Sequence, residues 1–310
     1  MIVLEHKTEQ LVTDILDSYK KYEITDKIDA ENMLSKSTLI KVVEEIRKVL
    51  FPGFFDENRA RSEYIKFLVG ERIEFIQYNL RKQIAKALGN QEMCRDCPKS
   101  TINQHAEEIT DKFLAKLTTI REYLDTDVQA AYNGDPAAYS TDEIIFSYPG
   151  LFAITVYRIA HELWLLEVPM IPRIMTEYAH SLTGIDIHPG ATVGKYFFID
   201  HGTGIVIGET TVIGDNVKIY QGVTLGALST RKGQQLKGVK RHPTIGDNVT
   251  IYSGTTILGG DTVIGSGATI GGNAFIVNSI SEGMRVSVRN PQLEFTNGNV
   301  SSSEFWDWSI

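Results

Sequence analysis

A histidine between carboxylates is the feature of this chain best suited to proton transfer. His201 stands in the run Phe198-Ile199-Asp200-His201-Gly202-Thr203-Gly204. An imidazole ordinarily titrates close to neutral pH, so an exposed histidine can take a proton from a hydroxyl group. Asp186 precedes it by 15 residues, and a carboxylate beside an imidazole fixes its tautomer and stabilises the imidazolium. We predict that His201 is a general base with Asp186 as its partner; the alternative is a surface histidine without a role.

The elements that position these residues repeat every six residues. The aliphatic positions are Ile187, Val193, Ile199 and Ile205, then Ile207, Ile213, Ile219 and Leu225, then Ile245, Ile251 and Ile257, then Ile264, Ile270 and Ile276. A hexapeptide period is typical of a parallel β-helix, in which three units of strand and corner make one coil of about 18 residues. Asp186 then lies nearly one coil before His201, so we expect the two side chains to stack closely.

A basic segment interrupts this repeat at residues 227–243. The step from Leu225 to Ile245 takes 20 residues, and the segment contains five lysines and arginines in a chain of net charge −8. We expect a loop that replaces about one coil, leaves the surface and meets an anionic ligand, because long loops in compact domains commonly bind ligands. The alternative is a solvated loop without a task.

The first half of the chain has the apolar period of helices. We predict helices over 5–24, 29–51, 58–88, a fourth from Ser100 or Thr101 past Ile120, 150–165 and 170–182, with Gly89 and Gly184 as C-terminal caps. The period changes near residue 184. We therefore predict an α+β protein with a helical domain over 1–184, a β-helical domain over 185–290 with its inserted loop, and a tail over 291–310.

Composition limits the partners. The 310 residues are 42% hydrophobic and 23% charged, as in globular proteins. We expect no nucleic-acid partner, because no basic stripe occurs, and no membrane span, because no apolar stretch of about 18 residues occurs. The N-terminus does not resemble a signal peptide and two cysteines cannot form a disulfide framework, so we predict a cytoplasmic location. Cys94 and Cys97 form a lone C-x-x-C, which we interpret as incidental, with a metal or redox role as the alternative.

Several motifs carry a resemblance to a known family. They are Gly184-Ile185-Asp186-Ile187-His188-Pro189-Gly190-Ala191, the run 200–210, Gln221-Gly222-Val223-Thr224-Leu225-Gly226, Arg241-His242-Pro243, Asp135-Pro136-Ala137 and Tyr157-Arg158-Ile159-Ala160-His161. From about residue 130 to 290 the chain resembles serine O-acetyltransferases, which are hexapeptide-repeat acyltransferases. The resemblance implies a left-handed β-helix, contrary to the usual right-handed crossover. It also implies a homotrimer or a dimer of trimers, with active sites between subunits.

The resemblance further implies a reaction and its residues. Acetyl would pass from acetyl-CoA, a co-substrate rather than a tightly bound cofactor, to the hydroxyl of L-serine, giving O-acetyl-L-serine for cysteine biosynthesis, with L-cysteine as feedback inhibitor. His201 and Asp186 would be catalytic. Asp135 and Asp200 would bind the serine ammonium, and Arg241 with His242 its carboxylate, which agrees with the charges of a small zwitterion.

The acetyl-CoA contacts are expected at backbone and small residues. The N–H of Gly226 or Ala227 would face the thioester oxygen, where a fixed donor stabilises an oxyanion. The family often has Gly-Gly where this chain has Gly226-Ala227, and its loop before Arg241 is often shorter. Plausible wall positions on later coils are Ser253, Gly254, Gly271 and Gly272.

The end of the chain suggests a partner. Phe305, Trp306 and Trp308 follow a stretch rich in Asn, Gly and Ser, and the chain ends in Ile310. Aromatic residues in a flexible tail favour docking on another protein, although they could fold back on the β-helix. The family commonly ends in Ile, which resembles a peptide ligand for O-acetylserine sulfhydrylase, and we predict this partner.

Three other functions stay open at this point. One is acetyl transfer to a sugar or antibiotic hydroxyl. Another is a zinc-dependent hydratase with His188, His201 and His242 as ligands, although we predict no metal. The third is a non-enzymatic scaffold.

Overall fold

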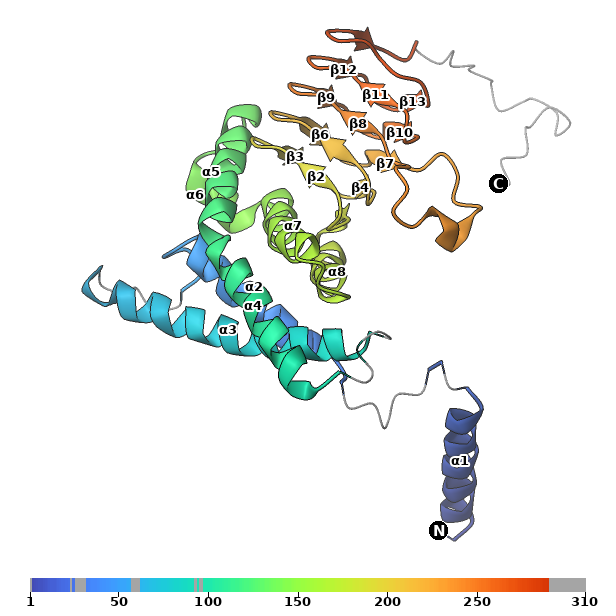
Figure 1. Cartoon of the computed structure of the whole chain (residues 1–310). Coiled ribbons are helices and arrows are strands. Elements are labelled where there is room, and N and C mark those ends of the chain that lie inside the picture. Colours follow the sequence, from blue (N-terminus) through green and yellow to red (C-terminus); the bar gives the residue numbers. More distant parts are fainter. Residues whose placement is uncertain are drawn as a thin grey trace, which may run out of the picture.

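The computed structural model describes residues 2–22, 24–25, 32–56, 62–91, 94 and 97–289. Helices fill the first part of the chain, and a column of short strands fills the second (Figure 1). The predicted order, a helical part followed by a parallel β-helix, is confirmed. Among the described residues no helix is long and apolar enough to cross a membrane.

The helices are α1 (Ile2–Lys21), α2 (Lys36–Leu50), α3 (Ile65–Gly89), α4 (Lys99–Ala115), α5 (Leu117–Gly134), α6 (Thr141–Ser147), α7 (Pro149–Leu165) and α8 (Ile171–Thr183), with a 3₁₀ turn at Ser62–Tyr64. Ser35 and Ser140 cap α2 and α6 with their side chains, as serine commonly does. Gly184 ends α8 with φ 69°, which confirms its predicted role as a cap.

Three details of the helical prediction were wrong. Gly89 is the last residue of α3 rather than its cap, which is Asn90. The predicted fourth helix is divided at Lys116, whose N–H bonds to the carbonyl of Phe113 in a tighter turn. Helix α6 was not predicted, because it spans only seven residues and shows too little of a helical period. The predicted helical residues 23, 29–31 and 58–61 lie outside the described residues.

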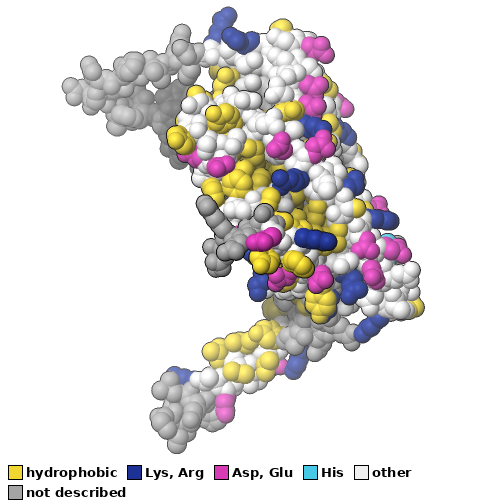
Figure 2. Space-filling model, turned by 90° about the vertical axis from the view of Figure 1, so that its left-hand side faces the viewer, with side chains coloured by type: hydrophobic (Ala, Val, Ile, Leu, Met, Phe, Trp, Pro, Cys, Tyr) yellow, Lys and Arg dark blue, Asp and Glu magenta, His cyan; other side chains and the backbone are white. Residues whose placement is uncertain are grey.

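Helix α1 exposes the face on which Leu11, Ile15 and Tyr19 stand, with 59%, 41% and 42% of their surface accessible. Figure 2 shows apolar side chains along this helix at the lower end of the molecule. The helical period of residues 5–24 therefore predicted the helix but not burial of its apolar face.

The β-helix has three faces, and each coil visits them in turn. The first face contains β1 (Asp186–Ile187), β4 (Val206–Ile207), β7 (Thr224–Gly226), β10 (Thr256–Leu258) and β13 (Phe275–Ile276). The second contains β2 (Thr192–Val193), β5 (Val212–Ile213), β8 (Thr244–Ile245) and β11 (Val263–Ile264). The third contains β3 (Phe198–Asp200), β6 (Lys218–Tyr220), β9 (Thr250–Ile251), β12 (Thr269–Ile270) and β14 (Arg285–Val286). All pairings are parallel.

One aliphatic side chain per strand fills the axis, as the repeat predicts. Ile187, Ile207, Leu225, Ile257 and Ile276 stand in register on the first face, and none exposes more than 7% of its surface. Stacked apolar side chains of this kind exclude water along the whole column. The repeat thus holds the corners, where polar residues stand, at fixed positions.

The inserted loop does not replace a coil, contrary to the sequence-based expectation. β7 lies on the first face and β8 on the second, so they are consecutive strands of one coil. The 20-residue step from Leu225 to Ile245 corresponds to the six-residue step from Ile207 to Ile213. The loop is therefore a pure insertion at the corner between the first and second faces, with one 3₁₀ turn at Gly233–Leu236.

A buried ion pair joins the helices to the first coil. Arg158 on α7 donates from Nε and Nη2 to the two carboxylate oxygens of Asp127 on α5, at 2.6 and 2.8 Å. Asp127 also accepts the N–H of Phe197 at 3.0 Å, and Arg158 donates to the carbonyl of Gly194 at 2.8 Å. Both side chains are almost fully buried. This network therefore fixes how the helices dock on the strands.

We expect Asp127→Asn to lower the free energy of unfolding by about 3–5 kcal/mol, because it leaves the buried Arg158 cation uncompensated. Urea denaturation followed by circular dichroism measures this change. Glu122→Gln is the control, since Glu122 pairs with Lys195 on the surface and such pairs contribute about 0–1 kcal/mol. Equal destabilisation by the two substitutions would contradict the assignment.

Candidate active site

The turn after β3 presents His201 at the edge between the third and first faces. The step from Ile199 to Ile207 takes eight residues, two more than the period, and His201 lies in this enlarged turn with φ 58°. Gly202 follows with φ 92°, where an added Cβ would meet Ile185 and Ile199. The His201 side chain is 75% exposed and its Nε2 lies 3.8 Å from Asp200. The two extra residues in the repeat therefore form the turn that exposes the imidazole of His201.

A carboxylate from the helices approaches the same edge. Asp135, directly after α5, accepts the Tyr148 hydroxyl at 2.6 Å and the N–H of Ala137 at 2.8 Å. The Tyr148 hydrogen bond, followed by the Ala137 N–H, lowers the pKa of Asp135, and the nearby charges of Lys218 and His201 act in the same direction. The same bond to Asp135, with burial, raises the pKa of Tyr148 to about 12. Asp135 is therefore ionised at neutral pH, and Tyr148 is a proton donor to it.

Lys218 on β6 joins these carboxylates. Its Nζ donates to the carbonyl of Gly134 at 2.6 Å and lies 3.4 Å from Asp200. Two carboxylates and one lysine leave this edge one negative charge in excess, not counting His201. Such an edge can accept one cationic group of a ligand.

Asp186 stands on β1 but does not bond to His201 in this chain. Its Oδ1 lies 3.5 Å from Arg173 on α8, and Arg173 also pairs with Glu177 at 2.5 Å. Among the described residues no hydrogen bond or ion pair joins Asp186 to His201. The two segments are nonetheless adjacent, because the N–H of Gly204 donates to the carbonyl of Gly184 at 2.8 Å.

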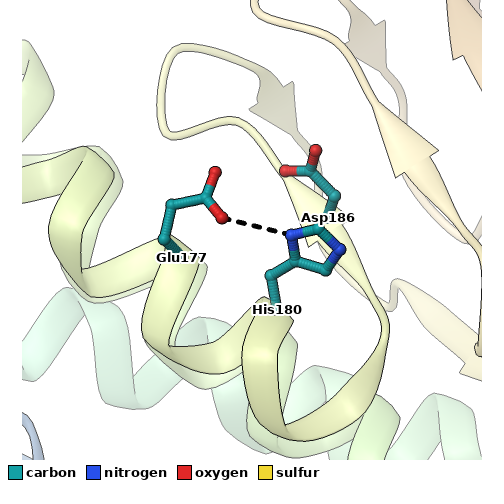
Figure 3. A group of neighbouring side chains, drawn as sticks. All are labelled: Glu177, His180 and Asp186. Atoms are coloured by element: carbon teal, nitrogen blue, oxygen red, sulfur yellow. Dashed lines mark hydrogen bonds and ion pairs between the residues drawn. The ribbon is translucent and has the colours of Figure 1, made fainter.

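Glu177, His180 and Asp186 form the one group among the described residues with the spacing of metal ligands (Figure 3). The Nδ1 of His180 faces Glu177 Oε2 at 3.2 Å, and all three side chains are partly exposed. The guanidinium of Arg173 already faces both carboxylates. This cation supplies the countercharge that a metal would otherwise provide.

Arg241 and His242 precede β8, at the edge between the first and second faces. Arg241 pairs with Glu209, and its Nη1 donates to the carbonyl of Leu236 in the inserted loop at 3.1 Å. The Nδ1 of His242 accepts the N–H of Thr210 at 3.0 Å. Only 22% of the Arg241 side chain is exposed. In the cationic half of the predicted site, the Arg241 guanidinium is thus held in place and largely shielded from solvent.

Two histidines at this second edge are neutral at physiological pH. Burial, followed by the charge of Arg241, lowers the pKa of His242 to about 4. Burial and the charge of Arg173 lower the pKa of His188 to about 4. His188 also lies edge-on to Trp164, with ring centroids 5.1 Å apart. Because His201 stands at the other edge of the same chain, the zinc alternative needs His188 and His242 of one copy beside His201 of another.

The predicted acetyl-CoA positions are divided between the two edges. Ser253, Gly254 and Gly272 stack in successive corners above the His201 turn, where the N–H of Gly254 donates to the carbonyl of Gln221 at 2.9 Å. Gly271 directly follows β12 on the third face and precedes Gly272. Gly226 ends β7, and Ala227 follows it where the inserted loop begins.

Four residues at these edges were not singled out from the sequence: Tyr148, Lys218, Glu209 and Thr210. Glu209 and Thr210 lay inside a quoted motif, but their partners are 32 residues away. Lys218 looks like an ordinary exposed strand position in the period-six pattern. Cys94 and Cys97 line a separate cavity of about 560 Å³ with lysines of α3 and α4.

Comparison with known proteins gives a consistent result. No protein-family model matches the chain. A plasmid-encoded serine acetyltransferase of Synechococcus elongatus is 46% identical over 231 residues, 73% of this chain and 72% of that protein. The serine acetyltransferase of Synechocystis is 47% identical over 133 residues, 43% of this chain and 51% of that protein.

Solved structures agree with these relatives. Serine acetyltransferase isoform 3 of Entamoeba histolytica, in complex with cysteine, superposes with a TM-score of 0.71 and 38% identity over 96% of this chain and 97% of that one. Serine acetyltransferase of Neisseria gonorrhoeae, in complex with serine, gives 0.53 and 28% over 80% of this chain and 95% of that one.

Proposed function

The chain belongs to the serine acetyltransferase family of acyltransferases, and we propose that it transfers acetyl from acetyl-CoA to the hydroxyl of L-serine at the two edges that flank the first face. The products would be O-acetyl-L-serine and CoA, and L-cysteine would be the feedback inhibitor. Related structures contain serine or cysteine, which share an ammonium and a carboxylate.

The observation that carries this proposal is the opposite charge of the two edges. Asp135 and Asp200 outnumber Lys218 at one edge, and Lys240 and Arg241 outnumber Glu209 at the other, where His242 is neutral. An amino acid carries one charge of each sign on a single carbon atom. Charge-assisted hydrogen bonds at both ends would hold it in one orientation, with its side-chain hydroxyl directed to His201.

The two edges of a single chain are too far apart to bind both ends of such a small ligand. The His201 turn follows the third face, and Arg241 precedes the second, so the width of the first face separates them. We propose that the His201 edge of one copy meets the Arg241 edge of the next, in a homotrimer that dimerises or remains alone. We also propose that the chain is divided into a helical domain over 1–184, a β-helical domain over 185–290 and a tail over 291–310, and that the protein is cytoplasmic.

The proposed chemistry is one acyl transfer through a tetrahedral intermediate. His201 takes the proton of the serine hydroxyl as its oxygen attacks the thioester carbon. The N–H of Gly226 or Ala227 donates to the resulting oxyanion, and a fixed donor of this kind lowers the barrier. The intermediate then expels the CoA thiolate, which recovers the proton from His201. Asp186 stabilises the imidazolium between these steps. For this, its carboxylate must leave Arg173 and bind to His201.

The acetyl-CoA chain is proposed to run along the stacked corners above His201. Ser253, Gly254 and Gly272 have small or absent side chains there, and Gly271 precedes them on the third face. Small residues let a pantetheine chain approach the backbone closely. The basic loop 227–243 at the facing edge would meet the CoA phosphates.

A steady-state assay tests the function. Release of free CoA thiol would be followed with acetyl-CoA and a panel of acceptors: L-serine, D-serine, L-threonine, a hexose and an aminoglycoside. We expect the highest kcat/KM with L-serine, with O-acetyl-L-serine identified by mass spectrometry. A sugar or an aminoglycoside as the best acceptor, or no turnover by any acceptor, would refute the proposal.

The tail is proposed to bind O-acetylserine sulfhydrylase through Ile310, which lies with residues 290–310 outside the described part of the chain. The terminal carboxylate would occupy the partner's amino-acid site. Deleting Ile310 should abolish capture of purified sulfhydrylase in a pull-down while acetyltransferase turnover stays unchanged. Capture that persists after the deletion would contradict the prediction, and replacement of Ser309 by alanine is the matched control.

A further inference from the structure

Thr210 directs every one of its polar groups at the Lys240–His242 segment. Its Oγ1 accepts the N–H of Arg241 at 2.9 Å and the N–H of His242 at 3.1 Å. The same hydroxyl lies 2.9 Å from Nδ1 of His242, and the N–H of Thr210 donates to that nitrogen at 3.0 Å. Its carbonyl accepts Lys240 Nζ at 2.6 Å. One side chain and its peptide therefore organise a segment 30 residues further along the chain.

These contacts fix the tautomer of His242. A ring nitrogen that accepts a peptide N–H must be unprotonated, so Nδ1 carries a lone pair and the proton resides on Nε2. The Thr210 hydroxyl, whose oxygen accepts two N–H groups, then directs its own proton at Nδ1. The ring lies directly against Gly208, where an added Cβ would overlap Cδ2 and Nε2. His242 is thus a neutral hydrogen-bond donor in a fixed orientation.

Lys240 Nζ is already bound to the carbonyls of Thr210 and Pro243, so Arg241 is the cation at this edge that can bind a carboxylate. Its backbone is held by Thr210, its Nη2 by Glu209, and its Nη1 by the carbonyls of Leu236 and Val239. A guanidinium with so many fixed contacts loses little freedom when it binds a carboxylate. Among the described residues, the hydrogen bond that holds the Arg241 backbone comes from Thr210 alone.

We propose that Thr210 is the positioning residue of the carboxylate subsite, which it builds as one cation, Arg241, beside one neutral Nε2–H donor, His242. The inference rests on the proposed function for its substrate, but the tautomer and the anchor can be tested without turnover. Thr210 acts through Arg241 and His242 and does not itself touch the amino acid. Its hydroxyl, rather than its methyl group, is the part that the subsite requires.

Three substitutions separate this role from a general effect on folding. Thr210→Val removes the hydroxyl with its size retained, Thr210→Ser restores it, and Thr211→Val changes the neighbouring residue. The Thr211 hydroxyl is buried without a hydrogen-bond partner among the described residues, so its loss should not lower the melting temperature. We expect Thr210→Val to raise the KM for L-serine about tenfold or more, because two N–H groups lose their acceptor. The KM for acetyl-CoA should change less than about twofold, and Thr210→Ser and Thr211→Val should resemble the unmodified protein.

Nitrogen-15 spectra of the unmodified protein, labelled at histidine, give an independent readout. We expect the His242 signals of a neutral ring with its proton on Nε2 at neutral pH. A proton on Nδ1, an unchanged KM for L-serine in Thr210→Val, or failure of Thr210→Ser to restore that KM would each overturn the inference. If the protein acetylates another acceptor, the proposed function fails, while the histidine spectra still decide the tautomer.

Discussion

Replacement of His201 by asparagine should lower kcat about 10²–10⁴-fold, the usual contribution of a general base. The serine hydroxyl is a poor nucleophile until a base takes its proton, and the other imidazole near Asp186, that of His180, already faces Glu177. Asparagine is the preferred substitution because His201 has φ 58°, which asparagine tolerates better than alanine does. Release of CoA thiol at saturating L-serine and acetyl-CoA measures the change.

The fold should survive this substitution, because the His201 side chain is 75% exposed and fills no core position. Circular dichroism and the melting temperature provide the check. Asp186→Asn should lose less activity than His201→Asn, since Asp186 supports the imidazolium without exchanging a proton with the substrate. Near-normal turnover in His201→Asn would show that another group is the base.

Replacement of Arg241 by alanine should raise the KM for L-serine at least about 30-fold, because truncating a charge-paired donor to a buried carboxylate costs about 2–5 kcal/mol. The KM for acetyl-CoA should rise far less. Inhibition by L-cysteine should weaken in parallel, since cysteine presents the same carboxylate. Initial rates over a matrix of both substrates, with and without L-cysteine, separate these effects.

Arg231→Ala is the matched control for Arg241→Ala. Arg231 carries the same charge in the same inserted loop, but its side chain is exposed and does not belong to the predicted serine site. A similar loss in both variants would show a general effect of the loop charge on anionic substrates. Equal weakening of serine and acetyl-CoA by Arg241→Ala, or cysteine inhibition that ignores it, would remove Arg241 from the serine site.

The sequence was sufficient for the β-helix and for the candidate residues at its corners. A period of six is a local property, because each strand buries one aliphatic side chain such as Ile207 or Leu225 against its equivalent in the next coil. The cap at Gly184 is local for the same reason. Short or divided helices were missed, since α6 and the break at Lys116 depend on a few hydrogen bonds rather than on a period.

The sequence by itself therefore determined the architecture and the family and predicted the residue types of the candidate site, because spacing and motif are written along the chain. The tertiary structure decided which of those residues meet. It placed His201 and Arg241 at different edges of the β-helix and on different coils, turned Asp186 toward Arg173, and brought Thr210 to His242 and Lys218 to Asp200. These contacts join segments that are remote in the chain, and the side chains involved follow no period. Their partners are set by how the coils stack and how the helices dock, which residue spacing does not encode.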